Sequence, residues 1–317
     1  MAFSGDLADH RRMTGNGQRQ SVAVVGLGSI GGIAAGCLAE TGRHDIIGCA
    51  RKPFDALTLE RPGRTVTLPL PVLTDPTQAK PVDWALVVTK TQDTAAAAPW
   101  LARLCTSATH VAVLQNGIDH IERVAPMTNG ATVVPVIVYY NGERLGPDRV
   151  RMRVAGEHDL AVPDDEGGRA FAALTQGTPL RVLVEPDFTT LKWRKLLLNS
   201  VANPITALTM QRQAVLRRPD IYALCLDVLA ETVKVARADG ATLADDEPKL
   251  VMERLMKFAP ELGTSMYFDR LAGRSFEVGA LTGAVVAAGE RYAIATPLNR
   301  VFLALLRAIN DAVATPP

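Results

Sequence analysis

Short apolar runs alternate with helical patterns through the first half of the chain. The strand candidates are SVAVVGL (21–27), HDIIGCAR (44–51), DWALVVTK (83–90), THVAVLQN (109–116) and ATVVPVIVYY (131–140). Strands this uniformly apolar are typical of a parallel sheet that helices cover on both faces. The alternation of strands and helices predicts an α/β fold. Two later stretches, 150–162 and 180–186, are predicted to be antiparallel additions to it.

From about residue 187 the pattern becomes entirely helical. Helices are predicted within 189–205, 219–240, 245–259, 275–292 and 297–313. The chain is long enough for two domains, each with its own core. We therefore expect a disordered tail over 1–20, a Rossmann dinucleotide-binding domain over 21–186, and an all-helical substrate and catalytic domain over 187–317.

The composition excludes several classes of protein. Hydrophobic residues make up 48% of the chain, charged residues 21%, and the formal net charge is +1. No nucleic-acid partner, membrane span or membrane-surface field is indicated. The four cysteines form no C-x-x-C pair, so neither a metal site nor a disulfide framework is predicted. The first twenty residues lack the apolar core of a secretion signal, and a cytoplasmic location is expected.

A glycine-rich turn follows the first predicted strand. Its sequence is Gly26-Leu27-Gly28-Ser29-Ile30-Gly31, and a helical pattern begins inside it. The first glycine permits a tight turn, the second lets the backbone approach a pyrophosphate, and the third allows close packing of helix on strand. Exposed amides at the helix start favour phosphates. The turn predicts dinucleotide binding, and the alternative is a strand-to-helix turn without a ligand.

Polar residues follow three further predicted strands. Arg51 and Lys52 stand where an NAD-binding protein would carry an acidic residue, which favours the 2′-phosphate of NADP, unless they are merely a solvated basic pair. Lys90 and Asn116 end two other strands, where an open parallel sheet binds its ligand. Lys90 is placed to meet the phosphate or ribose of the cofactor, and Asn116 its nicotinamide side. Either residue alone is also a common turn residue.

Lys195, Asn199 and Asn203 recur every four residues inside an apolar helical pattern. This spacing places them along one stripe of a helix, and the apolar residues between them make the stripe narrower than an ordinary solvent-exposed face. An amine beside two carboxamides suits a 2-keto acid, with Lys195 as the proton donor. Lys192, which partly shares the face, is the lesser candidate. Because Pro204 follows Asn203, a helix end or kink is expected there.

On these motifs the chain resembles the ketopantoate reductases from about residue 21 to 311. The blocks that carry the resemblance are GLGSIG, Lys90, LQNG ending at Gly117, WRKLLLNSVANPITAL (193–208) and TSMYFDRLAGRSFE (264–277). The resemblance implies NADPH-dependent reduction of 2-dehydropantoate to pantoate, on the route to pantothenate and coenzyme A. It makes Lys195 the general acid and places Glu277 beside that lysine and the cofactor. It assigns substrate contacts to Asn116, Asn199, Asn203 and Ser265, with Asn116 also touching the cofactor.

The chain departs from the family pattern after Glu277. Gly279 and Thr282 stand where an aspartate and an asparagine are usual. A reductase of another branched 2-keto acid or an opine-type dehydrogenase therefore remains an alternative. A regulator that keeps the fold without catalysis is disfavoured, because the whole catalytic set is present. A homodimer is compatible with a helical second domain of this kind.

Overall fold

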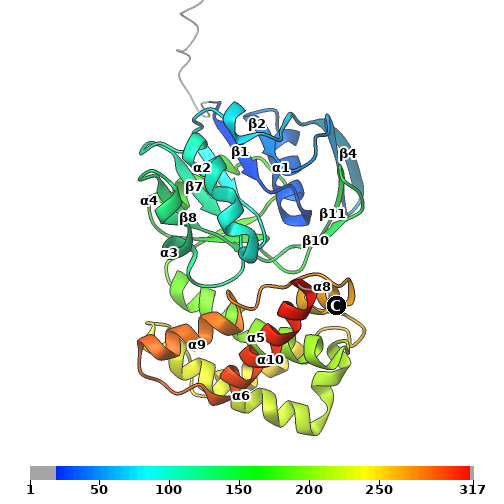
Figure 1. Cartoon of the computed structure of the whole chain (residues 1–317), viewed down its shortest axis with the longest axis vertical. Helices are drawn as coiled ribbons and strands as arrows, with labels where there is room; N and C mark the ends of the chain where they lie inside the picture. The colour runs from blue at the N-terminus through cyan, green and yellow to red at the C-terminus, as the bar shows by residue number, and fades with distance from the viewer. Residues whose placement is uncertain (1–18, 315–317) are drawn as a thin grey trace, which may run out of the picture.

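The computed structural model describes residues 19–314. A half that contains all the described strands lies above a helical half in Figure 1. The predicted disordered tail falls almost wholly on residues 1–18, outside the described part of the chain.

A six-stranded parallel sheet forms the centre of the first half, in the order β5-β2-β1-β6-β7-β8. Its strands are β1 (Ser21–Val25), β2 (Asp45–Cys49), β5 (Val72–Leu73), β6 (Trp84–Val87), β7 (His110–Val113) and β8 (Thr132–Pro135). Its helices are α1 (Ser29–Glu40), α2 (Ala98–Leu104) and α3 (His120–Val124), with 3₁₀ turns at Pro76–Gln78, Thr91–Ala97 and Ala125–Met127. The strand order reverses between β1 and β6, the position at which such sheets bind ligands.

A second sheet packs on the other side of α1, in the order β10-β11-β3-β4. Its strands are β3 (Ala56–Arg61), β4 (Arg64–Pro69), β10 (Asn141–Arg144) and β11 (Arg149–Arg153). The α1 glycines make this contact close, since a β-carbon on Gly32 would press on Val150 and one on Gly36 on Leu59. The glycine-rich run thus serves packing as well as the turn.

A third, smaller sheet has the order β13-β12-β9. Its strands are β9 (Ile137–Val138), β12 (Leu160–Pro163) and β13 (Val182–Glu185), and α4 (Glu166–Leu174) lies between β12 and β13 in the chain. The prediction of antiparallel additions is correct for β11 against β10 and for β12 against β9, but wrong for β13, which pairs with β12 in parallel. Because α4 is a helical crossover, the chain returns in the same direction.

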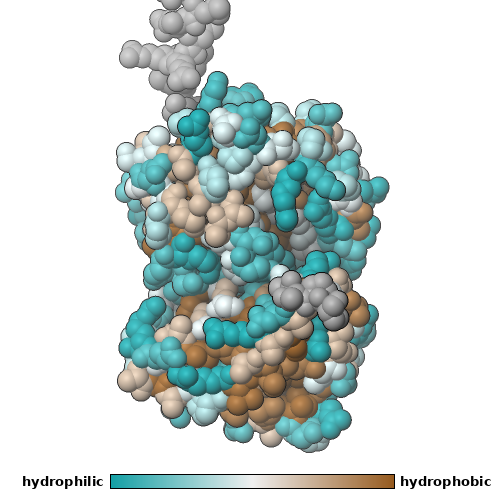
Figure 2. Space-filling view, viewed as in Figure 1, coloured by the Kyte–Doolittle hydropathy of each residue, from teal (hydrophilic) through white to brown (hydrophobic). Residues whose placement is uncertain are grey.

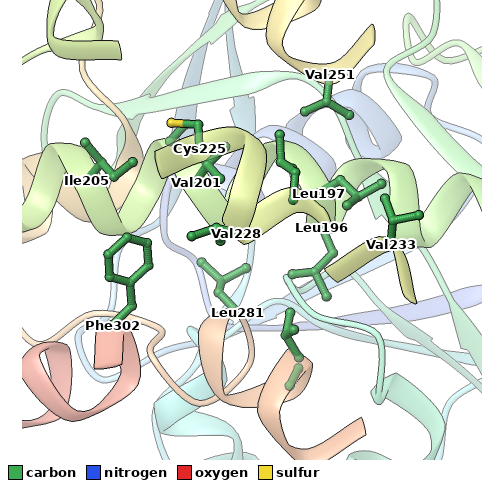
Figure 3. Packing of buried hydrophobic residues seen from close by; sticks show 14 of the residues in the cluster. Leu196, Leu197, Val201, Ile205, Cys225, Val228, Val233, Val251, Leu281 and Phe302 are labelled. Atoms are coloured by element: carbon green, nitrogen blue, oxygen red, sulfur yellow. The ribbon is translucent and has the colours of Figure 1, made fainter. Parts of the chain in front are cut away.

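The second half contains six α-helices among the described residues. They are α5 (Phe188–Thr209), α6 (Pro219–Ala238), α7 (Glu247–Met256), α8 (Ser265–Leu271), α9 (Thr282–Arg291) and α10 (Pro297–Ala314), with a 3₁₀ turn at Gln213–Arg217. Apolar residues of α5 such as Leu197 and Val201 pack against Cys225 and Val228 of α6 in the core shown in Figure 3. This core fixes the rotation of α5, and hence where its polar stripe faces.

Two sequence predictions for the helical half need correction. The expected helix start at residue 275 is wrong, because the backbone of Phe276 exchanges hydrogen bonds with the Asn310 side chain at 3.0 and 2.9 Å, and α9 begins only at Thr282. Of the helix end or kink expected at Asn203, the helix end is wrong. The helix α5 continues through Pro204 to Thr209, since Ile205 and Ala207 beyond the proline are buried in the core.

The fold class is confirmed as a Rossmann-like parallel sheet with helices followed by a helical region. The last strand ends at Glu185 and α5 begins at Phe188. The functional division into domains at residue 186 stays a prediction. No helix among residues 19–314 is long and apolar enough to cross a membrane.

Candidate active site

The glycine turn between β1 and α1 has the geometry of a phosphate cradle. Gly26 has a φ of 102°, and a β-carbon there would meet the backbone of Thr89 at 2.9 Å. A β-carbon on Gly31 would overlap the Gly26 carbonyl, whereas one on Gly28 would meet nothing within 4 Å. Within the described part of the chain no side chain caps α1, and its first turn carries no acidic residue. Free amides beside open space fit the pyrophosphate of a dinucleotide.

Lys90 and Asn116 lie at the carboxyl ends of neighbouring strands, as predicted. Lys90 follows β6 and pairs with Asp269 of α8, with 2.7 Å between Nζ and Oδ2. The Lys90 side chain is 43% exposed, whereas that of Asp269 is 7% exposed. Asn116 follows β7 and reaches toward the helical half. These strand ends therefore face α8 and the segment before α9.

A chain of hydrogen bonds joins Lys195, Asn116 and Glu277. The Lys195 ammonium donates to Asn116 Oδ1 at 3.2 Å, and Asn116 Nδ2 donates to Glu277 Oε2 at 2.7 Å. The other carboxylate oxygen of Glu277 accepts from the Thr91 backbone amide at 3.0 Å. Four segments far apart in sequence thus hold one amine in a fixed position.

Burial changes the acid strength of Lys195. Desolvation favours the neutral amine and lowers the Lys195 pKa from 10.5 to about 8, although the nearby Glu277 carboxylate opposes this shift. The side chain retains partial exposure to solvent. An amine with this pKa is protonated at neutral pH and is a stronger acid than an exposed lysine, which suits a proton donor.

The remaining residues of the stripe lie on the same helix at different depths. Asn199 lines a small pocket together with Lys195, and Asn203 is 4% exposed. Hydrogen bonds within residues 19–314 involve neither carboxamide side chain, which leaves both groups available to a ligand. Lys192 instead donates to the Ile118 carbonyl at 3.1 Å, and Arg194 turns away to pair with Glu247 of α7.

Two predicted residues stand apart from this cluster. Ser265 is exposed at the first position of α8, after Thr264, whose hydroxyl caps that helix and lies 2.7 Å from the Thr206 hydroxyl of α5. Ser265 is therefore near the far end of the stripe. Arg51 is exposed just beyond β2, on the carboxyl edge of the sheet.

Sequence reasoning missed three residues that shape the site. Asp269 holds Lys90, the Thr91 amide holds Glu277, and His120 lines the pocket beside Lys195. Asp269 lies in a predicted family block, but α8 was not recognised as a helix. A backbone amide such as that of Thr91 carries no sequence signal. His120 looks like any helix-start histidine.

The fold and the site define a dinucleotide-dependent oxidoreductase. The family description "Ketopantoate reductase PanE/ApbA" matches residues 22–165, and "Ketopantoate reductase PanE/ApbA C terminal" matches residues 187–310. The chain belongs to the ketopantoate reductase family, whose members use a nicotinamide dinucleotide. This confirms the family predicted from the sequence motifs.

Similar proteins cover nearly the whole chain. The 2-dehydropantoate 2-reductase of Mycobacterium tuberculosis is 40% identical over 92% of this chain and 98% of its own length. The enzyme of the same name from Caulobacter vibrioides is 38% identical over 91% and 98%. A ketopantoate reductase family structure from Ralstonia eutropha superposes with a TM-score of 0.84 at 29% identity, covering 93% of this chain and all of its own.

Proposed function

We propose that this protein reduces 2-dehydropantoate to pantoate with NADPH, in the synthesis of pantothenate and coenzyme A. The observation that carries the proposal is the Lys195–Asn116–Glu277 hydrogen-bond chain, which places a weakly acidic amine beside the strand ends that follow the glycine turn. Relatives 38–40% identical over most of the chain bear the name of this activity.

The residues of the first half fit NADPH. The amides that follow Gly26 in the turn and those at the start of α1 would hold the pyrophosphate, and the open space at Gly28 admits it. Arg51 would hold the 2′-phosphate, since a guanidinium offers two parallel hydrogen bonds to phosphate oxygens. When the cofactor binds, Lys90 would give up part of its contact with Asp269 and contact the cofactor instead.

In the proposed reaction NADPH supplies a hydride to the keto carbon. Lys195 donates a hydrogen bond to the carbonyl oxygen, stabilises the negative charge that develops there, and gives it a proton. Asn116 and Glu277 hold the amine in position. Asn199, Asn203 and Ser265 would bind the carboxylate and hydroxyl groups of the substrate. After turnover Lys195 regains a proton from solvent.

NADPH oxidation, followed by its near-ultraviolet absorbance, tests this reaction directly. The purified protein should oxidise NADPH with 2-dehydropantoate and prefer it over a panel of branched 2-keto acids. Preference for another acid would place the chain elsewhere within keto-acid reduction, and activity only with an added amine would indicate an opine-type dehydrogenase. The open space beside Gly279 and the buried Thr282 hydroxyl, which lacks a partner within residues 19–314, make the panel necessary.

A cytoplasmic homodimer completes the proposal. A similar ketopantoate reductase from Staphylococcus aureus, with a TM-score of 0.81 at 26% identity and coverage of 92% of this chain and 99% of its own, is described as dimeric. Figure 2 shows apolar side chains gathered over the helical half, where α10 exposes Val301 and Leu305 by 54% and 50%. Light scattering during gel filtration would distinguish a dimer from a monomer.

A further inference from the structure

His120, the first residue of α3, has one ring nitrogen without a partner among the described residues. The side chain is 1% exposed, and its Nε2 lies 2.8 Å from the Gln115 carbonyl oxygen. A carbonyl only accepts, so Nε2 carries the proton and Nδ1 of the neutral ring is left as an acceptor. Nδ1 is buried and meets no donor among residues 19–314. A buried acceptor of this kind calls for a ligand or an ordered water.

The space beside this imidazole is small and partly polar. Its walls are Gln115, Gly117, His120, Ile137, Lys192, Lys195, Leu196 and Asn199. The cavity measures about 10 Å³, which is room for about one water molecule and far too little for a branched keto acid. Its lining offers the two to four polar partners that a buried water requires. The pocket therefore has room for one water but not for the whole substrate.

We propose that this pocket binds one ordered water, which donates to His120 Nδ1 and accepts from Lys195 Nζ. The Lys195 ammonium has three donors, and Asn116 Oδ1 takes one of them. His120 thereby acts as a positioning residue, because its lone pair turns the water oxygen toward the amine. The consequence for turnover rests on the proposed function, whereas the water site itself does not.

The charges around the two groups agree with this arrangement. Two charged groups lie near Lys195: the Glu277 carboxylate, which belongs to the segment before α9, and Lys192, which belongs to the same helix as Lys195. Three charged groups lie near His120: Arg123 and Asp119, which are close to it in the chain, and Lys195 of α5. Burial lowers the His120 pKa to about 4, and the neighbouring cations contribute in the same direction, so the ring stays neutral and keeps its acceptor at neutral pH. The water then stabilises the ammonium form of Lys195.

Two substitutions of His120 test the acceptor at Nδ1 and the hydrogen bond donated by Nε2 separately. His120→Gln places an amide near Nε2 that still donates to the Gln115 carbonyl, but loses the acceptor at Nδ1. His120→Asn keeps an acceptor near Nδ1 and loses the bond to Gln115. We expect the alkaline limb of the kcat/KM profile for reduction to move about 0.5–1 pH unit lower in His120→Gln and to stay in place in His120→Asn. A shift in the Asn variant alone, equal shifts in both, or no shift in either would overturn the proposal.

A crystal structure of the unliganded wild-type protein supplies a readout independent of activity. It should show density for a water within hydrogen-bond distance of both Lys195 Nζ and His120 Nδ1, and the His120→Gln crystal should lose it. A dry pocket in well-ordered wild-type density would refute the water site. If the wild-type protein failed to reduce 2-dehydropantoate while the water was present, only the proposed function would fall.

Discussion

At the residue scale, the proposed chemistry depends on how burial and partners together set the protonation state of Lys195. Burial alone would drive the amine toward its neutral form, the Glu277 carboxylate counteracts that tendency, and the hydrogen bond to Asn116 holds the amine in position. The resulting pKa of about 8 keeps the proton in place at neutral pH. Because the acid must be protonated to act, kcat/KM for reduction should be flat below a pH of about 8 and fall about tenfold per pH unit above it.

Replacing Lys195 by alanine should lower kcat by roughly 10²–10⁴-fold, the usual contribution of a general acid. Lys195→Arg should be nearly as slow, because a guanidinium keeps the charge but does not release its proton in this range. Stopped-flow measurement of NADPH oxidation checks both variants. Lys192→Ala is the matched control and should keep activity within about tenfold, because Lys192 contacts a backbone carbonyl. Loss of activity in the control with retention in Lys195→Ala would exchange the two roles.

Because His120 is buried, we also expect the free energy of unfolding to decrease in acid. In the unfolded chain His120 has the ordinary pKa of 6.5, whereas burial lowers its pKa to about 4 in the folded protein. As pH falls, the unfolded chain therefore takes up a proton first. The free energy of unfolding should therefore decrease between pH 6.5 and about 4, by up to roughly 3 kcal/mol from this group. Urea unfolding at several pH values should show a flatter pH dependence for His120→Gln than for wild type. Parallel curves would contradict the assignment.

At the element scale, two glycines of the turn are expected to have different roles, one in packing and the other in cofactor binding. Gly31→Ala should destabilise the fold by about 1–3 kcal/mol, because the new methyl group would overlap the Gly26 carbonyl. Gly28→Ala should leave stability nearly unchanged, since that site is open and its φ of −74° suits any residue, but should raise the KM for NADPH. Thermal unfolding and initial rates distinguish the two effects. A stable Gly31→Ala protein would disprove the packing argument.

Elements with strong periodicity or turn chemistry could be predicted from the sequence, and those that depend on distant partners could not. The five apolar runs became β1, β2, β6, β7 and β8, with β9 as an extension of the last run. The hairpin of β3 and β4 was missed because polar residues alternate with apolar ones in it and both strands are partly exposed, and its place in a larger sheet comes from pairing with β11. The segment before α9 looked helical, yet Asn310, 34 residues beyond Phe276, bonds to its backbone and keeps it out of the helix.

At the scale of the whole molecule, the site exists only where the two halves meet. Four contacts of the site join the strand ends to the helical half there: Lys90 with Asp269, the Thr91 amide with Glu277, Asn116 with Lys195, and Asn116 with Glu277. The family resemblance predicted Asn116, Lys195 and Glu277 and placed Glu277 beside Lys195, but it did not predict the pairs made with Asp269 and with the Thr91 amide. Their pairing follows from how the cores orient the two halves, which local pattern cannot encode. Asp269 and the Thr91 amide therefore emerged only from the structure.

Cofactor binding should stabilise the whole molecule and report on Arg51. A ligand that binds only the folded state at 100 times its Kd adds about 2.7 kcal/mol, so saturating NADPH should raise the Tm measurably. Arg51→Ala should weaken NADPH binding about 10–100-fold through loss of the charge-assisted phosphate contact, and shrink the NADPH-induced rise in Tm. NADH lacks that phosphate, so the smaller rise in Tm that NADH causes should not change.

Lys80→Ala is the control, because it removes an exposed cation that precedes the amino end of β6, far from the binding edge, and it should match wild type. Equal losses for both cofactors in Arg51→Ala would mean that Arg51 supports the fold of the binding site and does not read the 2′-phosphate.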